Sequence, residues 1–411
     1  MLLVVEDMLG KNKIKDFKYL VACFVLLTSC ITGCQNPYSS SGEANINSGE
    51  ANIKVTDDIN EYLEVKMSAK QFVNEFHQEP IDNLIQQGKC FNYPKDVYFI
   101  PTHINNDAII FGEADFSDDR SELYLASYNL NNEEFKKIKK VDESSKFSSI
   151  GVIHTSDNIV LFEENNHENQ NSKLYLYDIK KNKYSLIKES KNMSPIHYTQ
   201  VCEMGNDLIL NILNTNENIY QNYIYSLDDF SLKLLEKENC GFPIVVNNQL
   251  YYIIIDNNNL NTKLVNFDLT NMKKTVLYST NSRTEYISGL YSDKNKVYMT
   301  IKDENDENWF YVDLHNKFID YSFSTSVIES VQFKNHYVSW AGSSTQENRV
   351  RLEYSLIDIN SKTNYINPNG MLLLSDNGFV CIKYKKNDLE IPKGEMYKYE
   401  NTSICYYEWQ S

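Results

Sequence analysis

The sequence is poor in glycine, proline and tryptophan, and no apolar run after its first 34 residues is long enough to cross a membrane. Of its 411 residues, 14 are Gly, 8 are Pro and 3 are Trp. So few glycines leave little room for loops that cradle phosphate groups. The chain has no G-x-S-x-G, H-E-x-x-H or C-x-x-C pattern, which excludes the hydrolases, metalloproteases and redox proteins that those motifs identify. We expect no cofactor and no bound metal.

Basic residues are also scarce relative to acidic ones. Lys and Arg number 40 against 56 Asp and Glu, which gives a formal net charge of −16. This balance argues against a nucleic-acid partner and against binding that depends on an anionic membrane surface. What the chain does have is 30 Tyr and 19 Phe, residue types that suit a large β core.

The N-terminus has the charge pattern of an export signal. A basic stretch, KNKIKDFK (11–18), precedes an apolar run over 19–27, and small residues follow. The apolar run is too short to span a bilayer as a stable helix. Two cysteines follow small residues in this region, Cys30 and Cys34. This order of basic, apolar and small residues predicts a secretory signal.

This ending, a small residue followed by cysteine, resembles a bacterial lipoprotein signal peptide. The resemblance implies that the cysteine is diacylated (in part by palmitate) and becomes the new N-terminus. Cys34 is the expected site because polar residues begin directly after it, and Cys30 is the alternative. Residues 1–34 then form the signal peptide, and the mature protein is anchored by lipid to the extracytoplasmic face of the cell membrane. A cleaved signal without lipid remains an alternative.

Residues 35–54 predict a flexible tether. SGEANIN (41–47) is followed directly by SGEANIK (48–54), a tandem repeat of small and polar residues that could not bury a core.

From residue 92 to residue 411 the chain repeats itself. Seven times, an apolar stretch runs into a short turn and a second apolar strand. One position in this turn is always Asn or Asp, which tolerate the left-handed backbone that tight hairpins require. These residues are Asn106, Asp157, Asn206, Asn248, Asn295, Asn335 and Asn377, at intervals of 51, 49, 42, 47, 40 and 42 residues.

Each repeat also has a second half with two more strands. Asp178, Asp228, Asp268, Asp313 and Asp358 leave the third strands, where a carboxylate can cap the next turn. Four short strands in 40 to 50 residues are typical of a propeller blade. The sequence therefore predicts an all-β, seven-bladed β-propeller, with six or eight blades as alternatives. It is similar to the unspecialised propellers of bacterial surface lipoproteins. It lacks the motifs of the specialised propeller families, so this resemblance implies no site residues.

Residues 55–91 differ from the repeats. SAKQFVNEFHQEPIDNLIQQGK (68–89) has apolar residues at helical spacing, interrupted by Pro80. We expect one or two short helices on the propeller rim, while EYLEVKM (61–67) could instead be a strand that closes the last blade. Five cysteines follow the signal: Cys90, Cys202, Cys240, Cys381 and Cys405. A disulfide among them is compatible with the sequence but cannot be assigned from it.

The first candidate site comes from aligning the repeats. Three residues before the turn position, the first three repeats have His103, His154 and Glu203, and the others have Val245, Ser292, Gln332 and Leu374. Equivalent residues on the innermost strands would surround one mouth of the central channel. Two imidazoles and a carboxylate there would suit proton transfer or a divalent metal, or simply form a hydrated wall.

The second candidate site is the set of loops between the second and third strands, which should all emerge on one face. These loops are acidic and rich in asparagine. They would form a binding face for a cationic peptide, a metal ion or sugars, or merely a solvated surface. The residues expected on this face are Asp115, Phe116, Asp118, Asp119, Tyr220, Asp303, Asp306 and Trp309.

Together these features favour a non-catalytic binding or scaffolding module with an unknown extracytoplasmic protein, peptide or glycan ligand. An envelope enzyme that acts on a glycan or peptide at the channel is the alternative. An accessory subunit of a transporter or sensor is a third hypothesis.

Overall fold

The structure is a computed structural model, and nearly all of its regular structure is β-strand. It describes residues 56–60, 64–66, 77–85, 88–92, 97–117, 122–142, 148–166, 168–190, 198–214, 217–256, 261–280, 285–293, 296–302, 306–313, 318–326, 330–346, 349–367, 370–384, 390–392 and 401–409. The predicted signal and tether, with Cys30 and Cys34, lie outside these ranges. No helix within them has the length and apolar character needed to cross a membrane.

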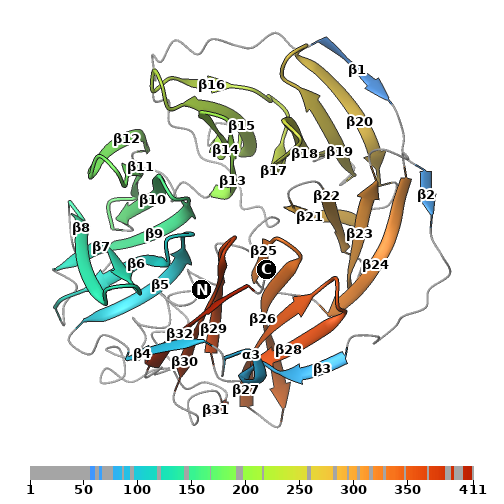
Figure 1. Cartoon of the computed structure of the whole chain (residues 1–411). Helices are drawn as coiled ribbons and strands as arrows, with labels where there is room; N and C mark the ends of the chain where they lie inside the picture. The colour runs from blue at the N-terminus through green and yellow to red at the C-terminus, as the bar shows by residue number, and fades with distance from the viewer. Residues whose placement is uncertain are drawn as a thin grey trace, which may run out of the picture.

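The strands form seven sheets arranged around a central axis (Figure 1). Blade 1 is β5 (Tyr98–Ile104), β6 (Ile109–Asp115), β7 (Leu123–Asn129) and β8 (Glu134–Lys140); blade 2 is β9 (Ser148–Thr155), β10 (Ile159–Asn166), β11 (Asn171–Asp178) and β12 (Lys183–Ser190); and blade 3 is β13 (Tyr198–Met204), β14 (Asp207–Asn214), β15 (Ile219–Ser226) and β16 (Leu232–Leu234). Blade 4 is β17 (Cys240–Val246), β18 (Gln249–Ile255), β19 (Thr262–Asp268) and β20 (Lys273–Ser279), and blade 5 is β21 (Tyr286–Asp293), β22 (Lys296–Lys302), β23 (Asp306–Asp313) and β24 (Phe318–Ser326). Blade 6 is β25 (Ser330–Lys334), β26 (Tyr337–Gln346), β27 (Arg349–Asp358) and β28 (Thr363–Asn367), and blade 7 is β29 (Gly370–Leu374), β30 (Gly378–Tyr384), β32 (Asn401–Glu408) and β4 (Lys89–Asn92). A short strand, β31 (Glu390–Pro392), also pairs with β27.

The first strand of each blade contacts the first strand of the next blade all the way round the ring, and β29 of blade 7 closes on β5 of blade 1. These strands are therefore the innermost ones. The prediction of an all-β, seven-bladed propeller is confirmed.

Apolar packing lies between the blades. The buried side chains fall into seven clusters, and each cluster joins one pair of neighbouring blades. The cluster between blades 5 and 6, for example, contains Tyr298, Trp309, Val338 and Ile357. The second strands of the blades, such as β6, β10 and β18, bury residues on both faces of their sheets, which explains their near-continuous apolar sequence.

The predicted turns lie where the alignment put them. Each described turn residue falls between the first and second strand of its blade, while Asn295 lies outside the described ranges. Asn248 and Asn335 have left-handed φ angles of 61° and 54°. Capping by aspartate is confirmed at Asp178, Asp268 and Asp358, each of which accepts hydrogen bonds from backbone N–H groups of the following turn.

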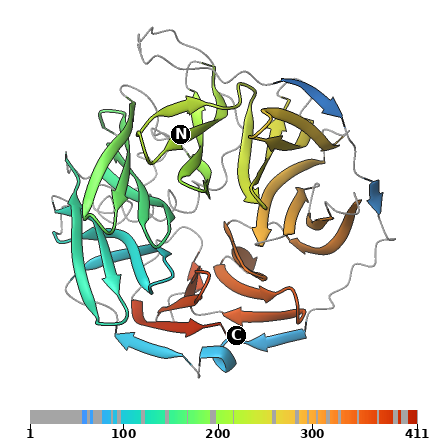
Figure 2. The same ribbon diagram turned by 45° about the horizontal axis from the view of Figure 1, so that its top comes forward.

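The N-terminal segment wraps around the outside of the ring. Its strands β1 (Thr56–Asn60), β2 (Glu64–Lys66) and β3 (His77–Pro80) pair in parallel with the outermost strands of blades 4, 5 and 6. After the four-residue helix α3 (Asp82–Ile85), β4 becomes the outermost strand of blade 7. Figures 1 and 2 show these elements along the outer rim. We call β1–β4 with α3 the belt.

The belt corrects two expectations. A short helix is present, and Ile81 beside it is buried between blades 6 and 7, but much of the segment is strand because the outer blade edges offer unpaired backbone groups. Residues 64–66 extend blade 5, so the hypothesis that 61–67 closes the last blade is wrong. The closing strand is β4. The propeller sheets thus include residues before 92.

A disulfide between Cys90 and Cys405 joins β4 to β32 across 315 residues of sequence. It links the end of the belt to the last strand of the chain. Cys202, Cys240 and Cys381 carry thiols.

Candidate functional site

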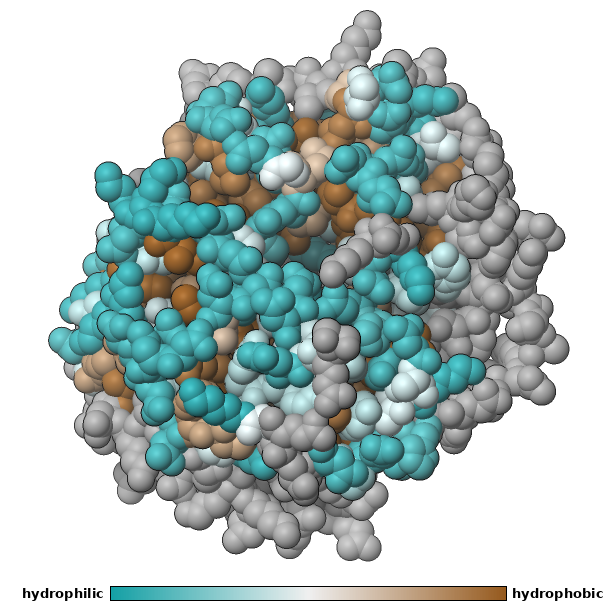
Figure 3. Space-filling model, in the orientation of Figure 1, coloured by the Kyte–Doolittle hydropathy of each residue, from teal (hydrophilic) through white to brown (hydrophobic). Residues whose placement is uncertain are grey.

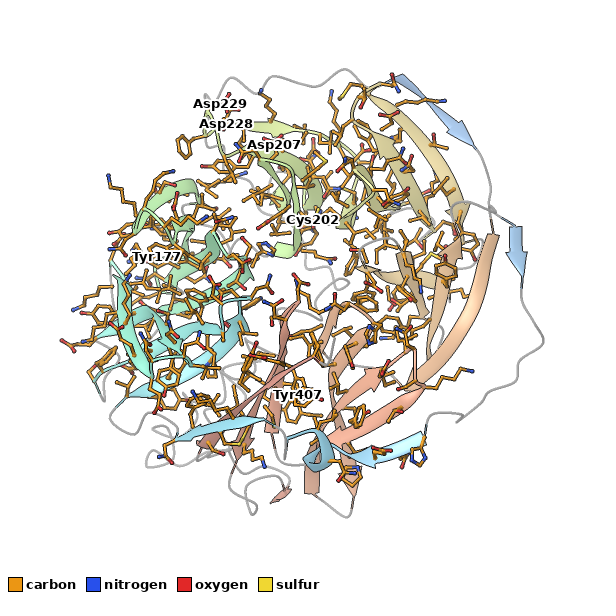
Figure 4. The ribbon with its side chains drawn as sticks, viewed as in Figure 1. Tyr177, Cys202, Asp207, Asp228, Asp229 and Tyr407 are labelled. Atoms are coloured by element: carbon orange, nitrogen blue, oxygen red, sulfur yellow. A yellow bond between two sulfur atoms is a disulfide. The ribbon has the colours of Figure 1, made fainter. Side chains whose placement is uncertain are left out.

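The structure places the aligned residues of the first candidate site at equivalent points on the innermost strands. His103 lies on β5, His154 on β9 and Glu203 on β13. Their counterparts Val245, Ser292, Gln332 and Leu374 lie on β17, β21, β25 and β29. The centre of the face shown in Figure 3 is largely hydrophilic, and Figure 4 places Cys202, the neighbour of Glu203, on the inner side of blade 3.

His154 and Glu203 form a direct contact between blades 2 and 3. The Nε2 atom of His154 lies 3.1 Å from Oε1 of Glu203, with side-chain exposures of 20% and 42%. This hydrogen bond lowers the pKa of Glu203, with further help from Ser156 and Lys334, although partial burial opposes it. Glu203 is therefore ionised at neutral pH, and Nε2 of His154 is the donor.

His103 is held as a neutral imidazole. Burial lowers its pKa to about 3, and the charges of His154 and Lys334 add to this effect, while a backbone hydrogen bond to Ile153 opposes it. Its Nδ1 atom is buried and has no hydrogen-bond partner among the described residues. A neutral imidazole offers one donor and one acceptor, so His103 can bind a polar group but cannot supply a positive charge.

The alignment did not select Lys334, yet its ammonium group influences both His103 and Glu203 from blade 6. Lys334 is the last residue of β25, and its Nζ lies 3.7 Å from Oδ1 of Asp376. A signal was present in the sequence: Lys334 and Asp376 each directly precede a turn asparagine of the repeat. We call His103, His154, Glu203 and Lys334 the axial cluster.

The turns beside the axial cluster are joined from blade to blade. Asn106 bonds to Asp157 of blade 2 through its backbone N–H (3.1 Å) and its amide group, and to Asp376 and Asn377 of blade 7. Asn335 of blade 6 donates to the carbonyl of Asp376 over 2.8 Å. Some turn asparagines thus hold the ring together, in addition to the local role predicted for them.

No group of three or more His, Cys, Asp or Glu side chains is placed to hold a metal ion within the described ranges. The His154–Glu203 contact therefore stands as a hydrogen-bonded pair. As a pair, it can hold a proton between an imidazole and a carboxylate or bind a polar ligand group.

At the second candidate site, two of the three aromatic residues expected on the acidic face are packed against other rings. Trp309 is fully buried and stacks on Tyr291 at 4.9 Å between ring centroids, so its place on a binding face is wrong. The cause is that β23 already begins at Asp306, which makes 306–309 strand. Phe116 packs edge-on against Tyr124 and Phe135, beneath Nζ of Lys137.

The remaining residues of this site are partly structural. Asp115 is buried and accepts hydrogen bonds from the backbone and hydroxyl of Ser117. Tyr220 is half-buried, and burial together with Glu163 raises its pKa. Asp118, Asp119 and Asp303 lie outside the described ranges, and for Asp306 only the backbone is described.

One small polar depression opens at the same end of blade 2. It is lined by Glu164, Asn166, Asn171 and Lys173. Glu164 forms an ion pair with Lys139, and Lys173 forms an ion pair with Asp142. The charged side chains that line the depression are therefore already paired with other residues of the protein. Figure 4 also labels three aspartates of blade 3: Asp207 begins β14, and Asp228 and Asp229 lie between β15 and β16.

The sequence matches no known protein family and no curated protein. The fold is similar to that of a prolyl endopeptidase, with a TM-score of 0.52 and 10% identity over 79% of this chain. The chain spans about half (51%) of that enzyme's length. It also resembles the propeller domain of the trilobed protease from Pyrococcus furiosus, with a TM-score of 0.49 and 13% identity over 75% of this chain and 96% of that domain. At 10% identity the likeness to the endopeptidase shows the fold alone. With its seven sheets around one axis, the chain is a seven-bladed β-propeller.

Proposed function

We propose that the protein is a lipid-anchored lipoprotein on the extracytoplasmic face of the cell membrane, and that its propeller binds a protein, peptide or glycan without catalysing a reaction. The axial cluster carries the binding part of this proposal. It brings an ionised carboxylate, an ammonium group and two imidazoles from four blades to the inner ends of the sheets. The anchor rests on the charge and cysteine pattern of residues 11–34.

The chemistry of the axial cluster suits a polar ligand with both donors and acceptors. Glu203 accepts hydrogen bonds, Lys334 donates them, and neutral His103 offers its Nδ1 atom. The side chains of Glu203 and Lys334 are 42% and 40% exposed, so a ligand can reach them. Peptides and glycans both carry such mixed groups, whereas a purely anionic polymer would be repelled by the net charge.

Site-specific photocrosslinking in intact cells tests the binding site. A photoreactive residue replaces Ser292, which lies in the same ring of positions, or Tyr184, which is 51% exposed on the outer strand of blade 2. We expect a ligand adduct from position 292 only. Glu203→Gln should weaken capture roughly 10- to 100-fold, because hydrogen bonds to charged groups contribute about 1.5–3 kcal/mol. Equal capture by the Glu203→Gln, Lys334→Met double variant would disprove the axial site.

The anchor is tested separately by metabolic labelling with a clickable palmitate analogue. Cys34→Ser should abolish the label, while Cys30→Ser should retain it. The reverse pattern would move the lipid to Cys30, and labelling of neither wild type nor variants would remove the anchor from the proposal.

The His154–Glu203 contact supports a second candidate, an envelope enzyme that uses this pair for proton transfer on a glycan or peptide. Purified protein is incubated with glycan and peptide libraries. Turnover that disappears in both His154→Gln and Glu203→Gln, while ligand capture persists in His154→Gln, would favour the enzyme over the binding module.

A further inference from the structure

Three cysteines lie side by side across blade 7. In the antiparallel register, Cys381 of β30 is directly opposite Cys405 of β32, and Cys405 is directly opposite Cys90 of β4. Directly opposite residues in antiparallel strands point to the same face of the sheet. The three sulfur-bearing side chains therefore form one row, with Cys405 in the middle. We call it the cysteine row.

The two ends of the row differ in environment. Cys381 and Cys405 are 0% and 2% exposed and belong to the apolar cluster between blades 6 and 7, beside Phe379 and Tyr407. Cys90 lies on the outermost strand and is exposed. The disulfide joins the exposed end to the middle of the row, and the buried end carries a thiol.

We propose that the cysteine row is a thiol–disulfide exchange site, in which the disulfide moves from Cys90–Cys405 to Cys381–Cys405. The thiolate of Cys381 attacks Sγ of Cys405, a new S–S bond forms, and the bond from Cys405 to Cys90 breaks. Cys90 leaves as a thiolate and takes up the proton that Cys381 has lost. One disulfide and one thiol are present before and after, so the step needs no oxidant or reductant.

The strand register places Cys405 directly opposite both Cys90 and Cys381. The Cα atoms of Cys90 and Cys405 are 4.0 Å apart. Opposite residues in antiparallel strands have Cα separations of about 4.5–5.5 Å, which places Cys381 within the range that disulfides span. Across the sheet, Cys405 lies between Cys381 and Cys90, which is the order that a linear exchange requires. Solvation of the leaving thiolate at exposed Cys90 favours departure.

The exchange would change the surface of the protein and the closure of the ring. It places a reactive thiolate at Cys90, which can attack the disulfide of a partner molecule. The strand β4 would then be attached to β32 by its ladder alone, over Lys89–Asn92. The partner class for this site is accordingly a disulfide-bearing molecule outside the protein.

Alkylation of the native, full-length protein tests the proposal without any reductant. The three cysteines fall in separate tryptic peptides, 90–95, 363–383 and 399–411. The folded protein is kept with N-ethylmaleimide at pH 7 to 9, and samples are digested without reduction. We expect label to accumulate on Cys90 as the 363–383 peptide becomes linked to 399–411. The rate should rise about tenfold per pH unit, because only the thiolate attacks.

Cys381→Ser removes the attacking sulfur and should leave Cys90 unlabelled and linked to Cys405. Cys202→Ser is the matched control, because it removes a thiol outside the row, and it should behave like the wild type. Persistence of the Cys90–Cys405 link in wild type over days at pH 9 would overturn the proposal. So would equal labelling of Cys90 in Cys381→Ser. If Cys381→Ser does not fold, the linked peptides of the wild type alone decide the question.

Discussion

The backbone N–H of Asp376 donates to the side-chain oxygen of Asn106 over 2.9 Å, although 270 residues separate them in sequence. This contact joins the last blade to the first. The amide group of Asn106 also reaches Asp157 of blade 2, so one side chain bridges three blades at the seam of the ring.

Asn106→Ala should destabilise the protein by about 2–3 kcal/mol, because it leaves several partly buried polar groups without partners. Urea unfolding measures the change. Asn271→Ala is the matched control, since its side chain bonds to Asp268 within the same turn, and it should cost no more than about 0.5 kcal/mol. An equal loss of unfolding free energy in the two variants would show that the contacts of Asn106 between blades add no stability.

A buried ion pair between blades 1 and 2 gives a second prediction. Nζ of Lys139 lies 2.6 Å from Glu164, and the two side chains are 1% and 6% exposed. Lys139→Met leaves the carboxylate buried without its cation and should cost about 3–5 kcal/mol. Lys181→Met breaks an exposed pair with Asp178 and should cost less than about 1 kcal/mol. Thermal unfolding of both variants checks the contrast. A Lys139→Met, Glu164→Leu double variant that recovers stability would confirm that the unpaired charge is the cause.

His103 should make the protein sensitive to acid. Its folded-state pKa of about 3 lies below the ordinary value of 6.5, so between these values the unfolded chain binds the proton more strongly. Stability should fall as pH falls from 6.5 to 3, by up to ~1.4 kcal/mol per pH unit. His103→Gln should flatten this slope in urea unfolding between pH 7 and 4. His77→Gln, at a position where the side chain is 74% exposed, should leave it unchanged. An unaltered slope in His103→Gln would contradict the buried neutral imidazole.

The disulfide at the end of the belt should stabilise the fold by restricting the unfolded chain. Because it closes a loop of 315 residues, Cys90→Ser should cost about 2–5 kcal/mol. Reduction of the wild type should lower its stability to the level of the variant. If Cys90→Ser unfolds at the same urea concentration as the oxidised wild type, the disulfide has no such role.

The blades were predictable because each is specified locally. Turn asparagines, flanking apolar strands and capping aspartates recur within 40 to 51 residues, and local hairpins need little else. The belt was not predictable, because β1–β3 are only five, three and four residues long and pair with strands more than 200 residues away. The residue pattern of these short strands does not indicate which strands they pair with.

The axial cluster was predictable in part for the same reason. Alignment of the repeats selected His154 and Glu203, and the structure brings them into contact. It missed Lys334, whose influence comes from the length of its side chain and not from an equivalent position. Trp309 was misplaced because a polar sequence beside it suggested a loop, whereas its alternate position in the strand points it into the core.

The parallel pairing of the belt has a mechanical consequence. Tension applied from the N-terminal side acts first on β1, then on β2 and β3, which are held by short ladders on three separate blades. These ladders would yield one after another and release up to ~110 Å of extended chain between Thr56 and Lys89. The Cys90–Cys405 bond then arrests the extension and transfers the load to β32 of blade 7. The belt is therefore an extensible segment that ends at a covalent link to blade 7.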